Sequence, residues 1–209
     1  MAAGRTDHAL ERLVFFSDAV FAIAITLLVI EIHAPHLDHH ATVAEQWRAL
    51  GALWPSFFGY LVSFMVIGLF WMGHHRAFAL ASTYSPRVLW WNLMLLAVIA
   101  FMPFFTAFYS NNITARVPVI VYCGAMLTAA LLNYKVNRTA TSPPMVGPDV
   151  PPEAIANVRG RGMGVVLGAA TAFAMSLVIP YGATAGLATI PLWQRLMIRL
   201  GRPGPADAG

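Results

Sequence analysis

Charged residues are scarce in this sequence: Asp, Glu, Lys and Arg make up only 11% of its 209 residues. A soluble domain would carry roughly a quarter. Hydrophobic residues account for 58%, and the mean hydropathy is +0.66. These proportions exclude a soluble globular domain and predict an all-α integral membrane protein. Cysteine is almost absent too, since Cys123 stands alone, so no disulfide framework can form within the chain.

Motifs for enzymatic chemistry are also missing. The sequence has no metalloprotease motif, no phosphate-binding glycine loop and no glycine elbow around Ser17. Asp18 and His74 have no nucleophile to act with, so we expect neither an enzyme nor a bound cofactor. No apolar stretch carries a ladder of arginines, which argues against strong voltage gating. The sequence also contains no TVGYG-like run, so we expect no re-entrant selectivity-filter loop.

Long apolar runs are what the sequence does contain. A spanning helix needs about 20 mostly apolar residues, and six stretches qualify, the last being shorter and weaker. They cover residues 13–32, 53–78, 88–109, 117–134, 162–180 and 184–200. We therefore predict one six-helix transmembrane domain over residues 1–200 and a disordered tail over 201–209. The first run lacks a good cleavage site after it, so we expect it to be retained rather than removed as a signal peptide.

Basic residues divide unevenly between the two sides of these spans. Eleven of the thirteen Lys and Arg precede the first span, lie in the second and fourth connections, or end the sixth, and only Arg48 and Arg116 lie on the other side. Basic residues mark cytoplasmic loops. Both termini of this multi-pass protein of the cell membrane are therefore predicted to be cytoplasmic, and the basic excess does not indicate nucleic acid. The fourth connection, 141–153, holds five prolines and is expected to be an extended linker.

Several polar residues lie within or beside the apolar runs, where ionisable groups are costly and usually face protein or water. Asp18, about one and a half turns into the first run, is the clearest case. Its partners are expected from FWMGHHRAF and WWNLML, in the second and third runs. A structural network is predicted around Arg12, Phe16, Ser17, Asp18, Trp71, His74, His75 and Asn92. Such a network can hold helices together or take part in gating, and both interpretations stay open.

Two further patterns also have open interpretations. Gly160, Gly164 and Gly168 recur every four residues, a spacing that lets two helices approach closely, although glycine is common in membrane helices generally. The run HAPHLDHH after the first span suits zinc binding, pH sensing or a solvated loop. It contains His33, His36, Asp38, His39 and His40, and we assign no metal site to it.

The first span has an apolar stripe on one face. At about 100° per residue, Ile23, Leu27 and Ile30 share this face, and Thr26 lies about 60° from Ile23. Asp18 points roughly 140° away from Ile23, so the carboxylate and the stripe cannot serve the same contact. A packing surface, a lipid-facing surface and a pore lining are all compatible with the stripe.

Three stretches together match a family signature. Arg12, Phe16, Ser17 and Asp18 read as R-x-x-x-F-S-D, and AVFAIAITLLVIEI continues the same helix. FWMGHHRAF and WWNLMLLAVIAFMPFFTAF follow in the second and third runs. These residues resemble the transmembrane protein 175 family of potassium channels, specifically over about Arg12–Phe108. Beyond that range the resemblance rests on the number and arrangement of the spans.

The resemblance implies a six-helix subunit like those of prokaryotic members, assembled as a homotetramer with the first helices lining a central pore. It implies an apolar constriction at Ile23, Leu27 and Ile30, with cation selectivity at Thr26. Glu31, at the outer end of this helix, would concentrate cations at the pore mouth or simply lie at the interface.

The implied function is a potassium-permeable cation channel with modest selectivity for potassium over sodium. The main alternative is a proton-coupled transporter or proton-permeable channel that uses Asp18 and the histidines. A non-conducting scaffold, in which the polar network is purely structural, is a third.

Overall fold

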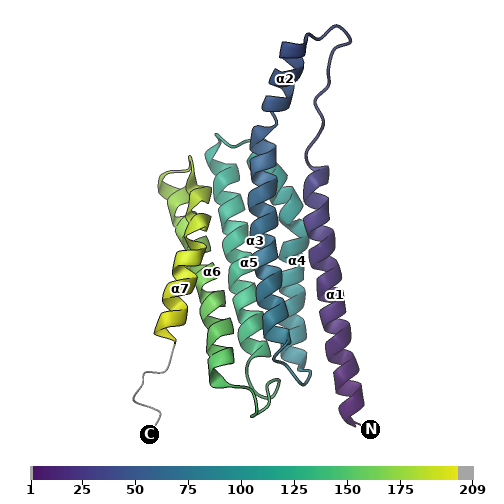
Figure 1. Ribbon diagram of the computed structural model, residues 1–209, viewed down its shortest axis with the longest axis vertical. Coiled ribbons are helices and arrows are strands. Elements are labelled where there is room, and N and C mark those ends of the chain that lie inside the picture. Colours follow the sequence, from purple (N-terminus) through teal and green to yellow (C-terminus); the bar gives the residue numbers. More distant parts are fainter. Residues whose placement is uncertain (1, 202–209) are drawn as a thin grey trace.

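The computed structural model describes the backbone of residues 2–201 and the side chains of residues 8–201. It is a bundle of long helices with one short helix projecting from one end (Figure 1). The elements are α1 (Ala2–Ile30), α2 (Val43–Gly51), α3 (Trp54–Phe78), α4 (Pro86–Ser110), α5 (Arg116–Ala140), α6 (Pro152–Val178), the 3-10 helix η1 (Ala183–Thr189) and α7 (Ile190–Leu200). The predicted all-α membrane architecture is confirmed.

Five helical segments within the described residues are long and apolar enough to cross a membrane. They are His8–Ile30, Val43–Phe78, Pro86–Ser110, Arg116–Ala140 and Pro152–Val178. The second of these joins α2 and α3 into one candidate. The short helix α2 was not predicted from the sequence.

Prolines mark the beginnings of several helices. Pro86 opens α4 and Pro152 opens α6, while Pro55 and Pro191 lie in the first turns of α3 and α7. The ring fixes φ near its helical value, and first-turn N–H groups have no intrahelical acceptor, so proline is favoured there. The bounds of α3 and α4 consequently agree with the predicted spans to within two residues.

Other helices run past the apolar stretches that predicted them. α1 begins well before residue 13 and ends at Ile30, α5 continues to Ala140 instead of ending at 134, and α6 begins at Pro152 instead of 162. Polar turns extend these helices beyond the apolar part, which is all that hydropathy detects. The predicted linker therefore ends at Pro151, and the predicted tail lies, from residue 202 on, outside the described residues.

The predicted single helix over residues 184–200 is wrong in form. This segment consists of η1 followed by α7, which has 11 residues and does not qualify as a span by itself. Gly182, with φ of 80°, turns the chain after α6, and Pro191 then starts a new helix. At about 2.0 Å per residue for η1 and 1.5 Å for α7, the two elements extend roughly 30 Å. They run back along α6 toward the end of the bundle where α1 begins (Figure 1).

Close packing of α6 against α7 explains the glycine pattern. A Cβ atom added at Gly164 would lie 2.5 Å from the Cα of Gln194, and one at Gly168 would collide with Ile190. Gly160 faces the same helix. Of the two interpretations left open for the four-residue spacing, the structure shows the close approach of two helices, with α7 as the partner.

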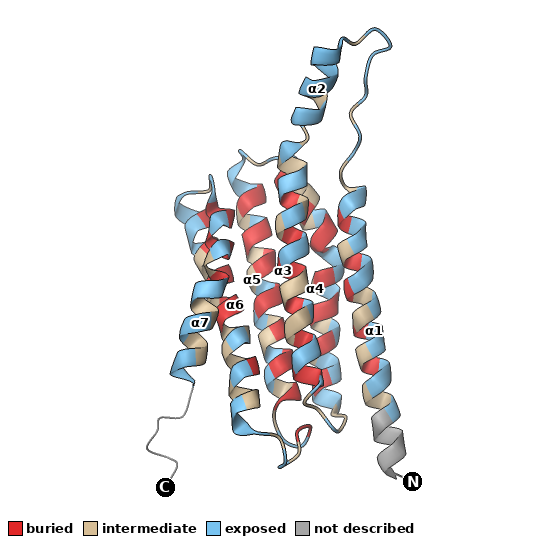
Figure 2. Ribbon diagram, viewed as in Figure 1, coloured by how far each residue is buried: buried red, intermediate tan, exposed pale blue. Residues whose placement is uncertain are grey.

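α1 lies at one margin of the bundle, where it packs against α3 and α4 (Figure 1). Its buried residues form a single stripe with helical spacing: Leu13, Ser17, Phe21, Ala24 and Leu28. Figure 2 shows that buried residues otherwise concentrate in α3 to α6, while the outer side of α1 is exposed. The first helix thus has one covered face and one open face.

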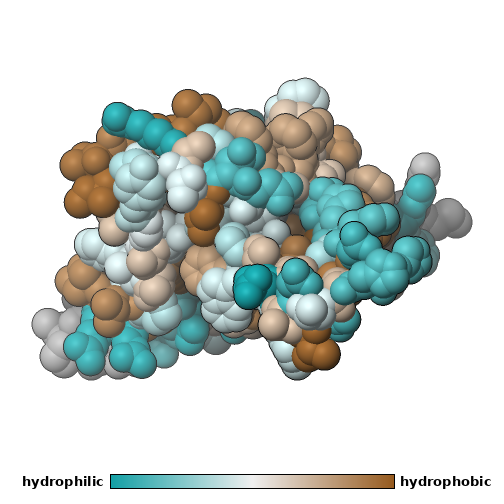
Figure 3. All heavy atoms as spheres, turned by 90° about the horizontal axis from the view of Figure 1, so that it is seen from above, coloured by the Kyte–Doolittle hydropathy of each residue, from teal (hydrophilic) through white to brown (hydrophobic). Residues whose placement is uncertain are grey.

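The surface combines polar ends with apolar sides. Viewed from the end where α2 projects, hydrophilic side chains cover much of the face and hydrophobic ones gather mainly toward its margins (Figure 3). Large hydrophobic residues are exposed along the sides of several helices, among them Leu61, Phe101 and Leu131. This distribution suits a bundle whose sides contact lipid.

Candidate functional site

A buried chain of hydrogen bonds joins α1, α4 and α3. The Ser17 hydroxyl donates to the Leu13 carbonyl at 2.7 Å, and Asn92 Nδ2 donates to Ser17 Oγ at 2.8 Å. His74 Nε2 lies 3.0 Å from Asn92 Oδ1. Ser17, Asn92 and His74 are all buried. One residue from each of three helices is therefore held in a single polar network.

The directions of these bonds fix the state of the histidine ring. Because the Ser17 proton goes to Leu13, Ser17 must accept from the Asn92 amide nitrogen, which turns Asn92 Oδ1 toward His74. His74 then donates from Nε2–H. Its Nδ1 has no hydrogen-bond partner among the described residues, and the ring contacts the aromatic rings of Phe21 and Phe78. The geometry is that of a neutral imidazole acting as a donor.

Asp18 makes a second link, from α1 to α3. Trp71 Nε1–H donates to Asp18 Oδ1 at 2.9 Å. The indole stacks on the ring of His75, with centroids 5.6 Å apart. Trp71 is 38% exposed, so this link lies at the surface of the subunit. The contacts among these residues thus fall into two parts, a buried one through Ser17 and a peripheral one through Asp18.

Arg12 and Phe16 lie beside these two parts. Both are exposed, and within the described part of the chain Arg12 forms no ion pair with Asp18. They line a cleft of about 450 Å³ between α1 and α4 that also includes Asn92. Tyr84, in the loop just before α4, lines the same cleft. Arg12 therefore shares this cleft with Asn92, the middle residue of the buried chain.

The apolar stripe occupies the open face of α1. Ile23 is 57% exposed, Leu27 40% and Ile30 65% in the isolated subunit. Thr26 is exposed beside them, and its hydroxyl bonds to the carbonyls of Ala22 at 3.0 Å and Ile23 at 2.9 Å. α3 and α4 do not cover the stripe, because the Ser17 and Asp18 contacts turn the opposite face of α1 toward those helices.

The loop after α1 carries the remaining predicted positions. Glu31 is half-buried directly after the end of the helix, and His33, His36, His39 and His40 are exposed. No group of three or more His, Cys, Asp or Glu side chains in the described residues is arranged to hold a metal ion.

Buried polar clusters elsewhere in the bundle were not predicted. Ser63 Oγ lies 2.8 Å from Thr106 Oγ1 and 2.9 Å from Tyr122 OH, which joins α3, α4 and α5. Thr106 donates its proton to the Met102 carbonyl, so Ser63 donates to Thr106 and Tyr122 donates to Ser63. No local motif marks this cluster, because its members are 43 and 59 residues apart in the sequence.

A second unpredicted cluster lies on α5. Asn137 Nδ2 donates to Asn133 Oδ1 at 2.7 Å, and Asn133 Nδ2 donates to the Phe70 carbonyl of α3 at 2.9 Å. The four-residue spacing of the two asparagines within a span was the one available signal.

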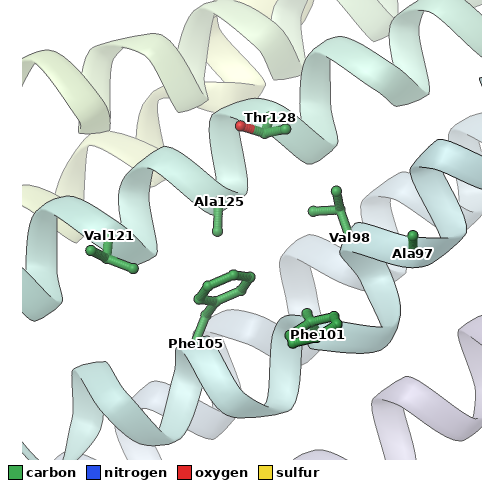
Figure 4. Close-up of a pocket in the computed structure, with 7 residues that line it drawn as sticks. All are labelled: Ala97, Val98, Phe101, Phe105, Val121, Ala125 and Thr128. Carbon is green, nitrogen blue, oxygen red and sulfur yellow. The ribbon is translucent and has the colours of Figure 1, made fainter.

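An apolar cleft between α4 and α5 offers nothing to an ion. It measures about 450 Å³ and is lined by Ala97, Val98, Phe101, Phe105, Val121, Ala125 and Thr128 (Figure 4). Thr128 brings the one hydroxyl group, which donates to the Gly124 carbonyl of its own helix. A cleft of this composition suits lipid or another apolar group.

Comparison with known proteins agrees with this arrangement. Residues 12–103 match the family described as the endosomal/lysosomal potassium channel TMEM175. The chain is 40% identical over 124 residues to a potassium channel of Streptomyces collinus. It is 30% identical over 141 residues to the human endosomal/lysosomal proton channel TMEM175. These alignments cover 57% and 62% of this chain, and 59% and 28% of the respective relatives.

Among solved structures, the chain resembles the crystal structure of a lysosomal potassium-selective channel TMEM175 homologue from Chamaesiphon minutus. The TM-score is 0.73 at 28% identity, over 94% of this chain and 100% of the other. The fold and these similarities define an all-α, multi-pass membrane protein whose relatives are described as ion channels. The chain has the fold of this TMEM175 homologue, and its match to the TMEM175 family lies over residues 12–103, where the sequence signature also lies.

Proposed function

We propose that this protein is a potassium-permeable cation channel of the cell membrane, formed by a homotetramer in which α1 of each subunit lines the pore. The observation that carries this proposal is the two-faced character of α1. One face is fixed to α4 by a buried hydrogen bond and to α3 by a peripheral one, and the other presents Ile23, Leu27 and Ile30 uncovered. Similarity to the TMEM175 family supports the same assignment.

The constriction would be a set of apolar rings. One copy of Ile23 from each subunit makes a narrow, dry passage, and such a ring can gate by dewetting. Leu27 and Ile30, one and two turns further along, extend the dry region. A polar side chain in this ring would keep the passage wet and remove the barrier to ions.

Thr26 is oriented to contact a cation. Its hydroxyl proton is directed at the backbone carbonyls of Ala22 and Ile23, so the lone pairs of Oγ1 remain available on the exposed side. Potassium holds its hydration water less tightly than sodium, so a site that replaces only some of that water favours potassium modestly. Glu31, at the following turn, would raise the local cation concentration at the outer mouth.

The orientation in the membrane follows from the basic residues. α1 begins and α7 ends at the same end of the bundle (Figure 1). Most Lys and Arg residues of the sequence lie on the side of the predicted spans that holds the two termini. This distribution supports an orientation with both termini in the cytoplasm.

A flux measurement in liposomes tests the proposal. Purified protein is reconstituted in vesicles loaded with potassium or sodium, and efflux is compared with that of an Ile23→Asn variant. The matched control is Leu61→Asn, because Leu61 has the same 57% exposure but lies on α3. We expect potassium flux above sodium flux in the unsubstituted protein, raised and less selective flux in Ile23→Asn, and no such change in Leu61→Asn. Equal fluxes in all three proteins would contradict the proposal.

A proton-permeable channel is the second candidate, and the name of the human relative favours it. Asp18 and His74 are titratable side chains that belong to the contacts holding α1 against α3 and α4. His74 Nδ1 is an acceptor without a described partner, although aromatic rings flank it. In a proton gradient, a proton-permeable channel should acidify the vesicle interior. Loss of this acidification in Asp18→Asn, with potassium flux unchanged, would select this candidate.

A further inference from the structure

The short helix α2 carries a narrow apolar stripe that nothing in the subunit covers. Val43, Trp47, Leu50 and Trp54, the last being the first residue of α3, follow one another at intervals of four, three and four residues. At about 100° per residue they lie within roughly 60° of each other. Their exposures are 69%, 69%, 44% and 70%. This alternation of four and three is the spacing of the seam of a coiled coil.

A helix as short as α2 needs a partner. It has nine residues, and none of them is buried. Its start is well defined, because Thr42 and Glu45 form a capping box in which Thr42 N–H donates to Glu45 Oε2 at 2.7 Å. Isolated helices of this length are marginal in water, and most helical stability in proteins comes from packing an apolar face. The exposed stripe is the face available for that packing.

The orientation of α2 disfavours lipid as the partner. α2 continues α3 and stands beyond the end of the bundle, roughly along the bundle direction (Figure 1). The two helices are joined through hydrogen bonds from Ala52 N–H to Arg48 O and from Leu53 N–H to Leu50 O. α3 alone has 25 residues, about 37 Å at 1.5 Å per residue, which already exceeds a hydrocarbon core of about 30 Å. α2 therefore stands outside the lipid core instead of lying flat in its surface.

We propose that the α2 helices of neighbouring subunits pack against one another in parallel through this stripe and form a collar over the end of the pore where Glu31 lies. The proposal rests on the tetrameric channel proposed above, in which a rotation axis along the pore makes all copies of α2 run in the same direction. The partner is a second copy of this chain.

The charges on α2 are compatible with this contact. Arg48 lies roughly 140° and Glu45 roughly 160° from Val43 around the helix, away from the seam. The positions that flank the seam are Ala44, Gln46 and Gly51, so no like charges would face each other between copies.

Cysteine cross-linking tests the collar, because the native Cys123 is buried within the bundle. Leu50→Cys places a thiol on the seam, and Arg48→Cys places one on the opposite side as a matched control. Membranes containing each variant are oxidised with copper phenanthroline, and covalent dimers are resolved by non-reducing electrophoresis. We expect Leu50→Cys to form dimers at least several-fold more than Arg48→Cys.

The same preparations are assayed for assembly and for potassium flux, so that the two proposals fail separately. Tetramers that conduct potassium while Leu50→Cys cross-links no more than Arg48→Cys would overturn the collar and leave the channel standing. Quenching of Trp47 fluorescence by brominated lipid would also overturn it, because lipid would then cover the stripe. Absence of any assembly of the unsubstituted chain would overturn both.

Discussion

The indole of Trp71 donates a hydrogen bond of 2.9 Å to the carboxylate of Asp18. The two residues are 53 positions apart and belong to α3 and α1. Because the side chain of Asp18 leaves α1 roughly 140° from that of Ile23, this bond fixes the rotation of α1 that leaves the Ile23 face open. This polar contact at the edge of the subunit therefore determines which face of α1 is left exposed in the middle of the helix.

The Asp18 to Trp71 bond should show measurable coupling. Asp18→Ala and Trp71→Phe each remove the bond and should each lower the thermal stability of the assembled protein, and the double variant should lose less than the sum of the two. A hydrogen bond to a charged group is worth about 1.5 kcal/mol, near the lower end of its range here because Trp71 is partly exposed. A double-mutant cycle on unfolding in detergent measures the coupling. Strict additivity would show that the bond contributes nothing.

Ser17→Ala should destabilise the protein more than its small change in volume suggests. It leaves a buried Asn92 amide proton without an acceptor, which costs about 1 to 3 kcal/mol. The matched control is Thr139→Ala, because Thr139 is half-buried and its hydroxyl bonds only within its own helix. Melting temperatures of the two variants, measured side by side, check this. Equal losses would indicate that the Asn92 amide finds another partner.

The α6 and α7 contact should be intolerant of a single methyl group. Gly164→Ala places a Cβ atom 2.5 Å from the Gln194 backbone and must push α7 away. Gly68→Ala is the control, since a Cβ there meets nothing within 4 Å, and removing a helical glycine should stabilise by up to about 1 kcal/mol. We expect lower yield and a lower melting temperature for Gly164→Ala alone. A neutral result there would mean that α7 does not pack as closely as described.

α2 should loosen in acid. The pKa of Glu45 is lowered from its ordinary value of 4.5, first by the hydrogen bond with the Thr42 side chain and then by the Thr42 N–H. A carboxylate whose pKa is lowered by folding stabilises the helix above the ordinary value, and that stabilisation disappears as the pH falls through the lowered one.

Hydrogen exchange of the α2 amides, followed from neutral pH into this acid range and corrected for intrinsic rates, should therefore show protection lost below about pH 4.5. Thr42→Val should reduce protection at neutral pH and remove most of its pH dependence. Protection that stays constant in the unsubstituted protein would rule out the capping box as a stabilising element.

Hydropathy and motif together predicted much of the fold and part of the site. The spans corresponding to α3 and α4 and the contacts among Ser17, Asn92 and His74 were expected, because apolar length and intramembrane polar residues are strong signals. The break before Pro191 was missed, since an apolar stretch looks the same whether it forms one helix or two.

Two other features could not be predicted for different reasons. Ser63 and Tyr122 bond to each other across helices, and nothing local to either residue marks a contact that only the packed bundle creates. α2 was missed because nine amphipathic residues beside a long span read as a polar loop.

The proposed pathway for ions runs along the open face of α1, and thiol accessibility in conducting protein distinguishes this path from any other. Ile23→Cys and, as a control with equal exposure on α3, Leu61→Cys are reconstituted and treated with a charged, membrane-impermeant methanethiosulfonate reagent during potassium flux. We predict that the reagent alters potassium flux through Ile23→Cys and leaves flux through Leu61→Cys unchanged. If the reagent instead altered flux through Leu61→Cys and left flux through Ile23→Cys unchanged, the ions would pass along a different face and the proposed pathway would be wrong.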